Sequence, residues 1–366
     1  MLAIVLMYGG RGRNDINDKT CHSHANGNLE WNLIMEIIPG IHQLKLPLKD
    51  NPLEYINAYL VKGTEGWVLI DTGWYDQESF DAFTEHLKNI GVGFKEINLI
   101  ICTHIHPDHF GLAGRLKEAC EAELAIGEVE REIIDLIADQ GSGLFENLNQ
   151  WMLANGVPGD HLFHFNEASS EALNLIIPAV PERGLKDGEV ISTGLFDLEV
   201  IWTPGHSPGH ICLYEANKRI LFSGDHILPV TTPNISIHVE EHGDPLGSYL
   251  DSIQKIRHLN MSLGLPAHEN IYTDLPKRLD ELLNHHEARK AEIIEALNSR
   301  PKTAFEVSAE ITWMEGMITW DELLPIDRRI AVTEALAHLE SLRVENRVSR
   351  FEESDFFYYQ LSSCIA

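Results

Sequence analysis

The stretch Thr103-His104-Ile105-His106-Pro107-Asp108-His109 places four side chains that commonly bind transition metals within six residues. It follows a short apolar run at 99–102, which predicts a strand. Imidazole and carboxylate groups bind zinc, manganese and iron, so this density predicts a metal site. In extended backbone His104, His106 and Asp108 share one side, and Pro107 keeps His106 out of the helical region. We therefore expect the ligands on a turn rather than inside a helix.

Other residues of the same type also stand where predicted strands end. Strand patterns cover 37–46, a hairpin at 55–61 and 67–71, strand 196–203, a second hairpin at 211–214 and 219–223, and a short strand before Leu265. Helical patterns cover 77–90, 110–120, 128 to about 185 with a helix at 144–153, and 245–259. The residues that follow the ends of these predicted strands are Asp71 in Asp-Thr-Gly, His206 in Gly-His, Asp225 in Gly-Asp and His268 in Ala-His. This recurrence indicates one site built from several strand ends.

Composition and charge limit the kinds of protein to which this chain can belong. The chain has 366 residues, of which 44% are hydrophobic and 23% charged, as in ordinary globular proteins with room for two domains. The formal charge of −28 predicts repulsion of nucleic acid and of anionic membranes. Five scattered cysteines without a C-x-x-C motif predict neither a disulfide framework nor a thiolate zinc site, and favour a cytoplasmic location. No apolar run is long enough to span a bilayer.

The combined motifs are His-x-His-x-Asp-His at 104–109, His206, Asp225 and His268, with Asp-Thr-Gly at 71–73. Their order resembles the metallo-β-lactamase superfamily of metallohydrolases over residues 35–280. The resemblance implies an α/β fold, an αββα sandwich of two mixed sheets flanked by helices. It also implies two divalent cations, with zinc expected and manganese or iron as alternatives. One ion would take His104, His106 and His206, and the other Asp108, His109 and His268, while Asp225 bridges both. Asp71 would orient the ligand loops rather than bind.

The same resemblance implies hydrolysis by a hydroxide that bridges the two ions, with Asp108 and Asp225 as the catalytic carboxylates. We expect a small ester, thioester, lactone or related acyl compound as substrate. One alternative is an endoribonuclease or phosphodiesterase of the same fold. A second is an iron-dependent oxidoreductase similar to the persulfide dioxygenases of the superfamily. A non-enzymatic binding or regulatory module is the third.

The predicted domains are a poorly ordered extension at 1–34, a catalytic domain at 35–280 and a second domain at 281–366. The helical region at about 128–185 interrupts the catalytic motifs and is either a lid over the site or a packing appendage. In the last domain, helical patterns at 277–297, 304–311 and 327–342 precede a hairpin at 344–350 and 356–361, which resembles a winged helix. Nine basic and fifteen acidic residues from 285 to 366 disfavour nucleic acid there. We expect this domain to pack on the catalytic core or to form a homodimer contact.

Overall fold

The computed structural model describes residues 35–49, 51, 53–140, 143–173, 179–237, 243–313 and 318–362. The predicted extension at 1–34 lies outside the described residues. No helix among the described residues is both long enough and apolar enough to cross a membrane.

The first sheet has seven strands in sequence order. Its first four strands pair in antiparallel order, and its parallel half begins where β4 pairs with β5. Helices connect the parallel strands, as parallel pairing requires. The strands are β1 (Met35–Ile38), β2 (Ile41–Pro47), β3 (Tyr55–Lys62), β4 (Trp67–Ile70), β5 (Ile97–Cys102), β6 (Glu123–Gly127) and β7 (Arg183–Leu185).

The second sheet has five strands in the order β12-β11-β10-β9-β8. Among its described strands only β11 and β12 pair in parallel, so this sheet is mixed as well. Every residue of β10 and β11 is buried, which is expected for central strands covered on both faces. The strands are β8 (Val190–Ser192), β9 (Asp197–Trp202), β10 (Ile211–Glu215), β11 (Ile220–Gly224) and β12 (Leu263–Pro266).

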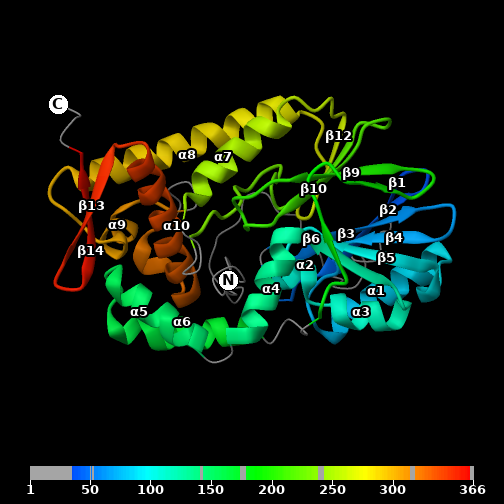
Figure 1. Cartoon of the computed structure of the whole chain (residues 1–366), viewed down its shortest axis with the longest axis horizontal. Helices are drawn as coiled ribbons and strands as arrows, with labels where there is room; N and C mark the ends of the chain where they lie inside the picture. Colours follow the sequence, from blue (N-terminus) through cyan, green and yellow to red (C-terminus); the bar gives the residue numbers. More distant parts are fainter. Residues whose placement is uncertain are drawn as a thin grey trace, which may run out of the picture.

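Three hydrophobic layers show the predicted αββα sandwich. The sheets pack on each other through one layer, in which Ile101 of β5 and Phe222 of β11 are members. A second layer joins the first sheet to α1 (Gln77–Ile90) and α3 (Ala113–Cys120). A third joins the second sheet to α7 (Pro245–Ile256) and α8 (Leu275–Leu297). Figure 1 shows the layers with the helices outermost. The predicted fold class is confirmed.

The bounds of α1 follow from its two ends. The carboxylate of Asp76 accepts a hydrogen bond from the backbone nitrogen of Ser79, which satisfies a free donor of the first turn. Gly91 adopts a left-handed conformation with φ 77°, and its backbone nitrogen bonds to the last carbonyls. The sequence prediction of a helix over 77–90 that ends at Gly91 is confirmed.

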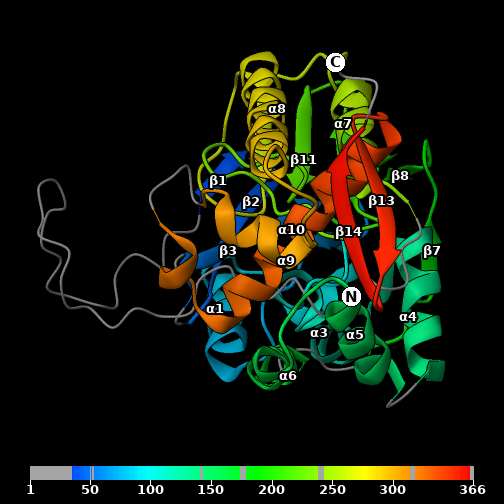
Figure 2. The ribbon, with the colours of Figure 1, turned by 90° about the vertical axis from the view of Figure 1, so that its left-hand side faces the viewer.

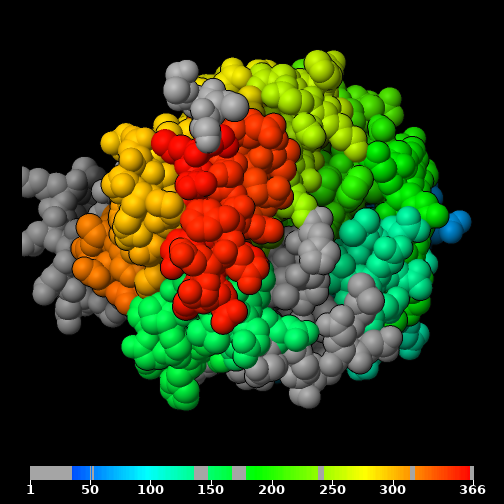
Figure 3. All heavy atoms as spheres, turned by 60° about the vertical axis from the view of Figure 1, so that its left-hand side comes forward, coloured from blue at the N-terminus to red at the C-terminus, as the bar shows by residue number. Residues whose placement is uncertain are grey.

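The helical region after β6 and the C-terminal helices share one hydrophobic cluster. Met152 and Phe165 pack there with Val332 and Leu336, and Figures 2 and 3 show the C-terminal residues lying against α5. The region is therefore packed against the C-terminal elements. The elements are α4 (Glu128–Gln140), α5 (Gly143–Ala154), α6 (Gly159–Leu173), α9 (Ala304–Glu310), α10 (Pro325–Val344), β13 (Val348–Glu353) and β14 (Phe356–Leu361).

The C-terminal part of the chain consists of helices and a two-stranded antiparallel sheet, β13 with β14. Helix α8 is continuous from Leu275 to Leu297, and its residues join both the third layer and the C-terminal cluster. The domain division predicted at residue 280 falls inside this helix and stays a prediction.

Candidate metal centre

The structure brings all seven predicted ligands together at one end of the sandwich, in two groups that share Asp225. Each ligand lies in a segment that follows the end of β5, β9, β11 or β12, so the ends of both sheets build the site. The first group is His104, His106, His206 and Asp225, and the second is Asp108, His109, His268 and Asp225.

In the first group, three imidazoles turn ring nitrogens toward one another. Nε2 of His206 lies 3.2 Å from Nε2 of His104 and 2.9 Å from Nδ1 of His106. Nε2 of His104 lies 2.6 Å from Nδ1 of His106. Oδ2 of Asp225 lies 3.5 Å from Nε2 of His206. His106 thus presents a different ring nitrogen from its two partners.

In the second group, two imidazoles and two carboxylates converge. Nε2 of His268 lies 3.1 Å from Oδ2 of Asp108 and 3.5 Å from Oδ1 of Asp225. Nε2 of His109 lies 3.6 Å from Oδ2 of Asp108 and 3.4 Å from Oδ2 of Asp225. The Asp108 and Asp225 side chains are 17% and 11% exposed while both histidines are almost fully buried. The carboxylates therefore mark the open side of the centre.

These separations fit two metal ions. Ligand atoms about 2.0 to 2.2 Å from a tetrahedral zinc ion lie about 3.3 to 3.6 Å from each other. Most of the donor–donor distances fall near that range, and all the candidate donors of each group lie within 4.8 Å of one another. Neutral imidazole and carboxylate are a donor set that suits zinc, manganese and iron. The residues present can therefore hold two divalent ions.

Hydrogen bonds on the far side of three rings direct Nε2 into the centre. Nδ1 of His206 lies 2.8 Å from the carbonyl oxygen of Asn234, and Nδ1 of His268 lies 3.2 Å from that of Tyr55. A carbonyl only accepts, so each Nδ1 carries the proton and each Nε2 keeps its lone pair. Nδ1 of His109 bonds in the same way to Oδ2 of Asp71, 3.0 Å away. Each of these rings can therefore present Nε2 to a metal ion.

Asp71 holds the loops of the centre without entering either group. Its Oδ1 accepts from the backbone nitrogen of Thr103 at 2.8 Å, and both oxygens lie within 3.1 Å of the Thr103 hydroxyl. Asp71 is buried and has φ 60°, a left-handed conformation in which a non-glycine residue is strained. The placement agrees with the orienting role predicted for Asp71.

Burial and mutual charge shape the protonation of the centre. Burial, together with the neighbouring histidines, lowers the pKa of His104 well below its usual value, which keeps the ring neutral. Burial opposes charge on His109 too, but the carboxylates of Asp225, Asp108 and Asp71 raise its pKa well above the usual value. Burial disfavours the charged form of Asp225, yet His268 and His109 hold its pKa well below the usual range. The anionic half of the centre thus calls for cationic compensation.

One local expectation is wrong. His106 is extended, with φ −58° and ψ 148°, as Pro107 predicts. Pro107, however, begins the short helix α2 (Pro107–Phe110), because proline suits the first helical position. Asp108 and His109 therefore lie inside a helical turn, and the predicted helix at 110–120 is two helices, α2 and α3.

Several supporting residues have no signal in the sequence. The carbonyls of Asn234 and Tyr55 act through the main chain, so their residue type carries no information. His210 is given no role by the sequence, yet its Nε2 accepts a hydrogen bond from the backbone nitrogen of Asp225 at 3.2 Å. Glu130 of α4 is fully buried and accepts from the Ser207 hydroxyl and, at 3.1 Å, from the backbone nitrogen of Gly209.

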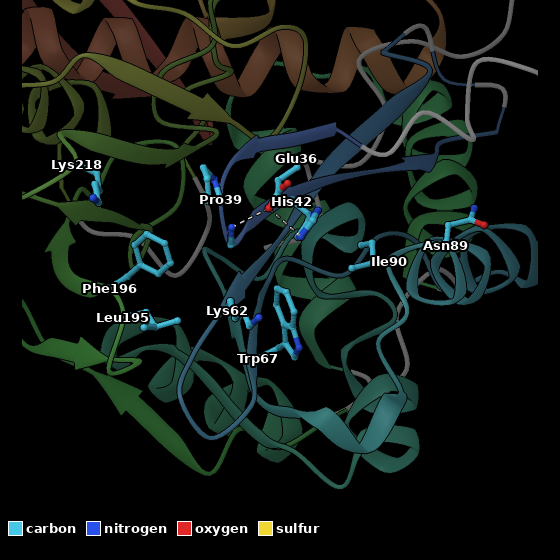
Figure 4. A pocket seen from close by; sticks show the side chains of 11 residues that line it. Glu36, Pro39, His42, Lys62, Trp67, Asn89, Ile90, Leu195, Phe196 and Lys218 are labelled. Atoms are coloured by element: carbon cyan, nitrogen blue, oxygen red, sulfur yellow. Dashed lines mark hydrogen bonds and ion pairs between the residues drawn. The ribbon is translucent and has the colours of Figure 1, made fainter.

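A separate surface hollow lies at the other end of the sandwich. Figure 4 shows it lined by Glu36, His42, Lys62, Trp67 and Phe196, among others. Strand β4 begins at Trp67 beside this hollow and ends next to Asp71 at the metal centre. None of the seven predicted ligands lines the hollow.

Proteins with similar sequences are named as lactamase-like proteins or as metallo-hydrolases. A lactamase-like protein from Aspergillus niger is 26% identical over 67% of this chain, and the match spans 59% of that relative's length. A probable metallo-hydrolase from Bacillus subtilis is 24% identical over 83% of this chain and 92% of its own.

Solved structures share the fold over most of the chain. A metallo-beta-lactamase family protein from Thermus thermophilus has a TM-score of 0.74 and 28% identity, covering 88% of this chain and 99% of its own. A beta-lactamase domain protein from Burkholderia ambifaria has a TM-score of 0.78 at 24% identity, covering 91% and 95%. The sequence model of the metallo-beta-lactamase superfamily matches residues 51–268, a range that contains Asp71 and all seven clustered ligands. The chain belongs to the metallo-beta-lactamase superfamily.

Proposed function

We propose that this protein is a hydrolase that uses two divalent cations, with zinc as the expected metal, on a small acyl substrate such as an ester, thioester or lactone. The observation that carries the proposal is the sharing of Asp225 between two complete donor groups. Divalent cations bound there would polarise a carbonyl and lower the pKa of water. A relative named as a probable metallo-hydrolase supports the reaction class.

In this proposal the carboxylates and the histidines of the centre have different roles. Asp225 and Asp108 are the partly exposed carboxylates, so they border the substrate side. With the ions bound, the five histidines would supply neutral nitrogens, and Asp71, Asn234 and Tyr55 fix three of those rings. The cluster therefore needs no serine, cysteine or lysine nucleophile, which separates it from covalent hydrolases.

Charge favours a small substrate over nucleic acid. Lys290 pairs with Glu345, Lys302 with Glu310, and Arg350 with Glu340. Further basic residues after 285 that form such pairs are Arg289, Arg300, Arg343 and Arg347. Arg329 is buried, 1% exposed. Basic groups already paired with carboxylates gain little from phosphate, so the winged-helix-like part offers a poor nucleic-acid surface.

The test combines metal analysis with a substrate panel. Protein freed of metal and then loaded with zinc, manganese or iron is assayed on esters, thioesters, lactones, β-lactams and phosphodiesters. We expect two ions per chain and hydrolysis of an acyl compound that Asp225→Asn reduces at least about a hundredfold. His258→Ala removes an exposed histidine and is the matched control for the ligand variant His206→Ala. Turnover of phosphodiesters alone, or oxygen uptake by the iron form, would contradict the proposal.

A further inference from the structure

The ring of His206 is held from the side opposite the metal centre. Its Nδ1 donates to the carbonyl oxygen of Asn234, 2.8 Å away. Asn234 belongs to a loop of buried residues, 233–237, which continues to Ser236 and Ile237. Whatever fixes this loop therefore also fixes the direction in which Nε2 of His206 points.

A ladder of hydroxyl and amide groups ties the loop to α10. The Thr333 hydroxyl lies 2.9 Å from the carbonyl oxygen of Ile330, to which it donates. The same hydroxyl lies 3.0 Å from the Ser236 hydroxyl oxygen, which is its other acceptor. The Ser236 hydroxyl accepts from the side-chain nitrogen of Asn234 at 3.0 Å or donates to its Oδ1 at 3.1 Å. Each hydroxyl can donate once and can also accept, so hydrogen bonds can connect Asn234 with the helix in either direction.

The main chain repeats the connection. The backbone nitrogen of Ile237 donates to the carbonyl oxygen of Thr333 at 3.3 Å. Thr333 and Ser236 are both only 1% exposed, so water cannot readily replace a lost partner. Ile237 also belongs to the hydrophobic cluster of the C-terminal helices. The loop thus belongs to the packing of α10 as well as to the site.

We infer that Thr333 is a positioning residue for the metal centre, which acts on the ligand His206 through Ser236 and the carbonyl of Asn234. Helix α10 is then part of the support of the site, beyond its packing on α6 and α7. The inference rests on the proposed use of two metal ions, and it adds a C-terminal residue outside the matched range 51–268 to the machinery of the site.

The test is a metal titration of the full chain, with cobalt followed by its absorption and zinc followed by competition with a coloured chelator. Thr333→Val keeps the shape of the side chain and removes the hydroxyl, which leaves the Ser236 hydroxyl without its hydrogen-bond partner on α10. We expect about tenfold weaker binding of one of the two ions, the one held by His206, with a changed cobalt spectrum for that ion only. Thr333→Ser restores the hydroxyl and is expected to restore the affinity.

Two further variants make the result decisive. Thr84→Val is the matched control, because the Thr84 hydroxyl bonds to the carbonyl of Phe80 in the same helical manner, but on α1. Ser236→Ala removes the same contact from the loop rather than from α10, and we expect the same loss of metal affinity as in Thr333→Val. It also tests the inference if Thr333→Val folds poorly. Wild-type affinity for both ions in Thr333→Val and Ser236→Ala, or an equal loss at both ions, overturns the inference. Normal metal binding by wild type without any hydrolysis would instead contradict only the proposed function.

Discussion

Nδ1 of His109 lies 3.0 Å from Oδ2 of Asp71, although 38 residues separate them in the chain. Asp71 follows β4 and His109 lies in α2, after the neighbouring strand β5. The other oxygen of Asp71 accepts from the backbone nitrogen of Thr103. One carboxylate therefore fixes both the loop after β5 and the proton position of a ligand ring.

Asp71→Asn should weaken metal binding by about 10 to 100-fold. The backbone nitrogen of Thr103 needs an acceptor, so the new amide group must turn its nitrogen toward His109. That nitrogen donates, which forces the proton of His109 onto Nε2, the atom that faces Asp225. Chelator competition with zinc measures the loss. Asp81→Asn makes the same chemical change at an exposed site of α1 and should bind metal as wild type does; equal affinity in both variants would contradict this role for Asp71.

Most strands and the ligand positions were readable because each depends on a local pattern, whereas β6 and β8 were not predicted and β7 ends a range predicted to be helical. Apolar runs mark the buried strands, and Asp76 and Gly91 mark the two ends of α1. His206, Asp225 and His268 could be placed near the 104–109 cluster because they all stand at strand ends or the turns beside them, and strand ends of packed sheets meet. Side-chain chemistry and strand position indicated one shared site, and the resemblance to the metallo-β-lactamase superfamily implied which residues gather there.

The orientation of the ligands was not readable, because it depends on main-chain groups and on distant packing. Nothing in a residue's type tells that the carbonyl of Asn234 accepts from His206, or that His106 presents Nδ1. The contact of Thr333 with Ser236 joins positions 97 residues apart without any charge or motif. The short helix α2 was missed because proline was interpreted only as a constraint on His106, and not also as a helix start.

Removal of metal should lower the unfolding temperature. An ion that binds only the folded chain stabilises it by about 2.7 kcal/mol when present at 100 times its dissociation constant. Without an ion, Asp225 and Asp108 share a buried space with imidazoles whose charge must balance them. Calorimetry before and after chelation, with zinc added back, measures the shift. His206→Ala should show a smaller shift than wild type, and His258→Ala the same shift; identical transitions with and without metal would speak against ion binding.

Gly205→Ala should destabilise the fold and disturb the centre at His206. Gly205 has φ 139°, and an added Cβ would lie 2.5 Å from Cα and 2.8 Å from the backbone nitrogen of Tyr249 in α7. Backbone atoms of a packed helix cannot move aside cheaply, so we expect a loss of about 2 to 5 kcal/mol in the free energy of unfolding. Urea unfolding measures it. Gly188→Ala has a left-handed φ of 77° with nothing within 4 Å, so it should lose only about 1 kcal/mol; an equal loss would show that strain, and not the contact with Tyr249, decides.

Glu130→Gln should stabilise the protein above neutral pH. Burial raises the pKa of Glu130 from 4.5 to about 7, although the Ser207 hydroxyl and the backbone of Gly209 oppose the shift. Between these two values the folded chain holds a proton that the unfolded chain releases. The stability of wild type therefore falls as pH rises from about 4.5 to 7, and the loss is complete above that range. A glutamine keeps the accepting oxygen and does not ionise.

The gain from Glu130→Gln is at most about 3 kcal/mol at pH 8 and should vanish near pH 4.5. Urea unfolding at the two pH values measures the difference between variant and wild type. Glu118→Gln alters an exposed carboxylate of α3 and should leave that difference near zero at both. A variant that is less stable than wild type at pH 8 would mean that Glu130 is held as a carboxylate by partners stronger than Ser207 and Gly209. In that case the contact of Glu130 with the loop after His206 would depend on the negative charge of the carboxylate rather than on its proton.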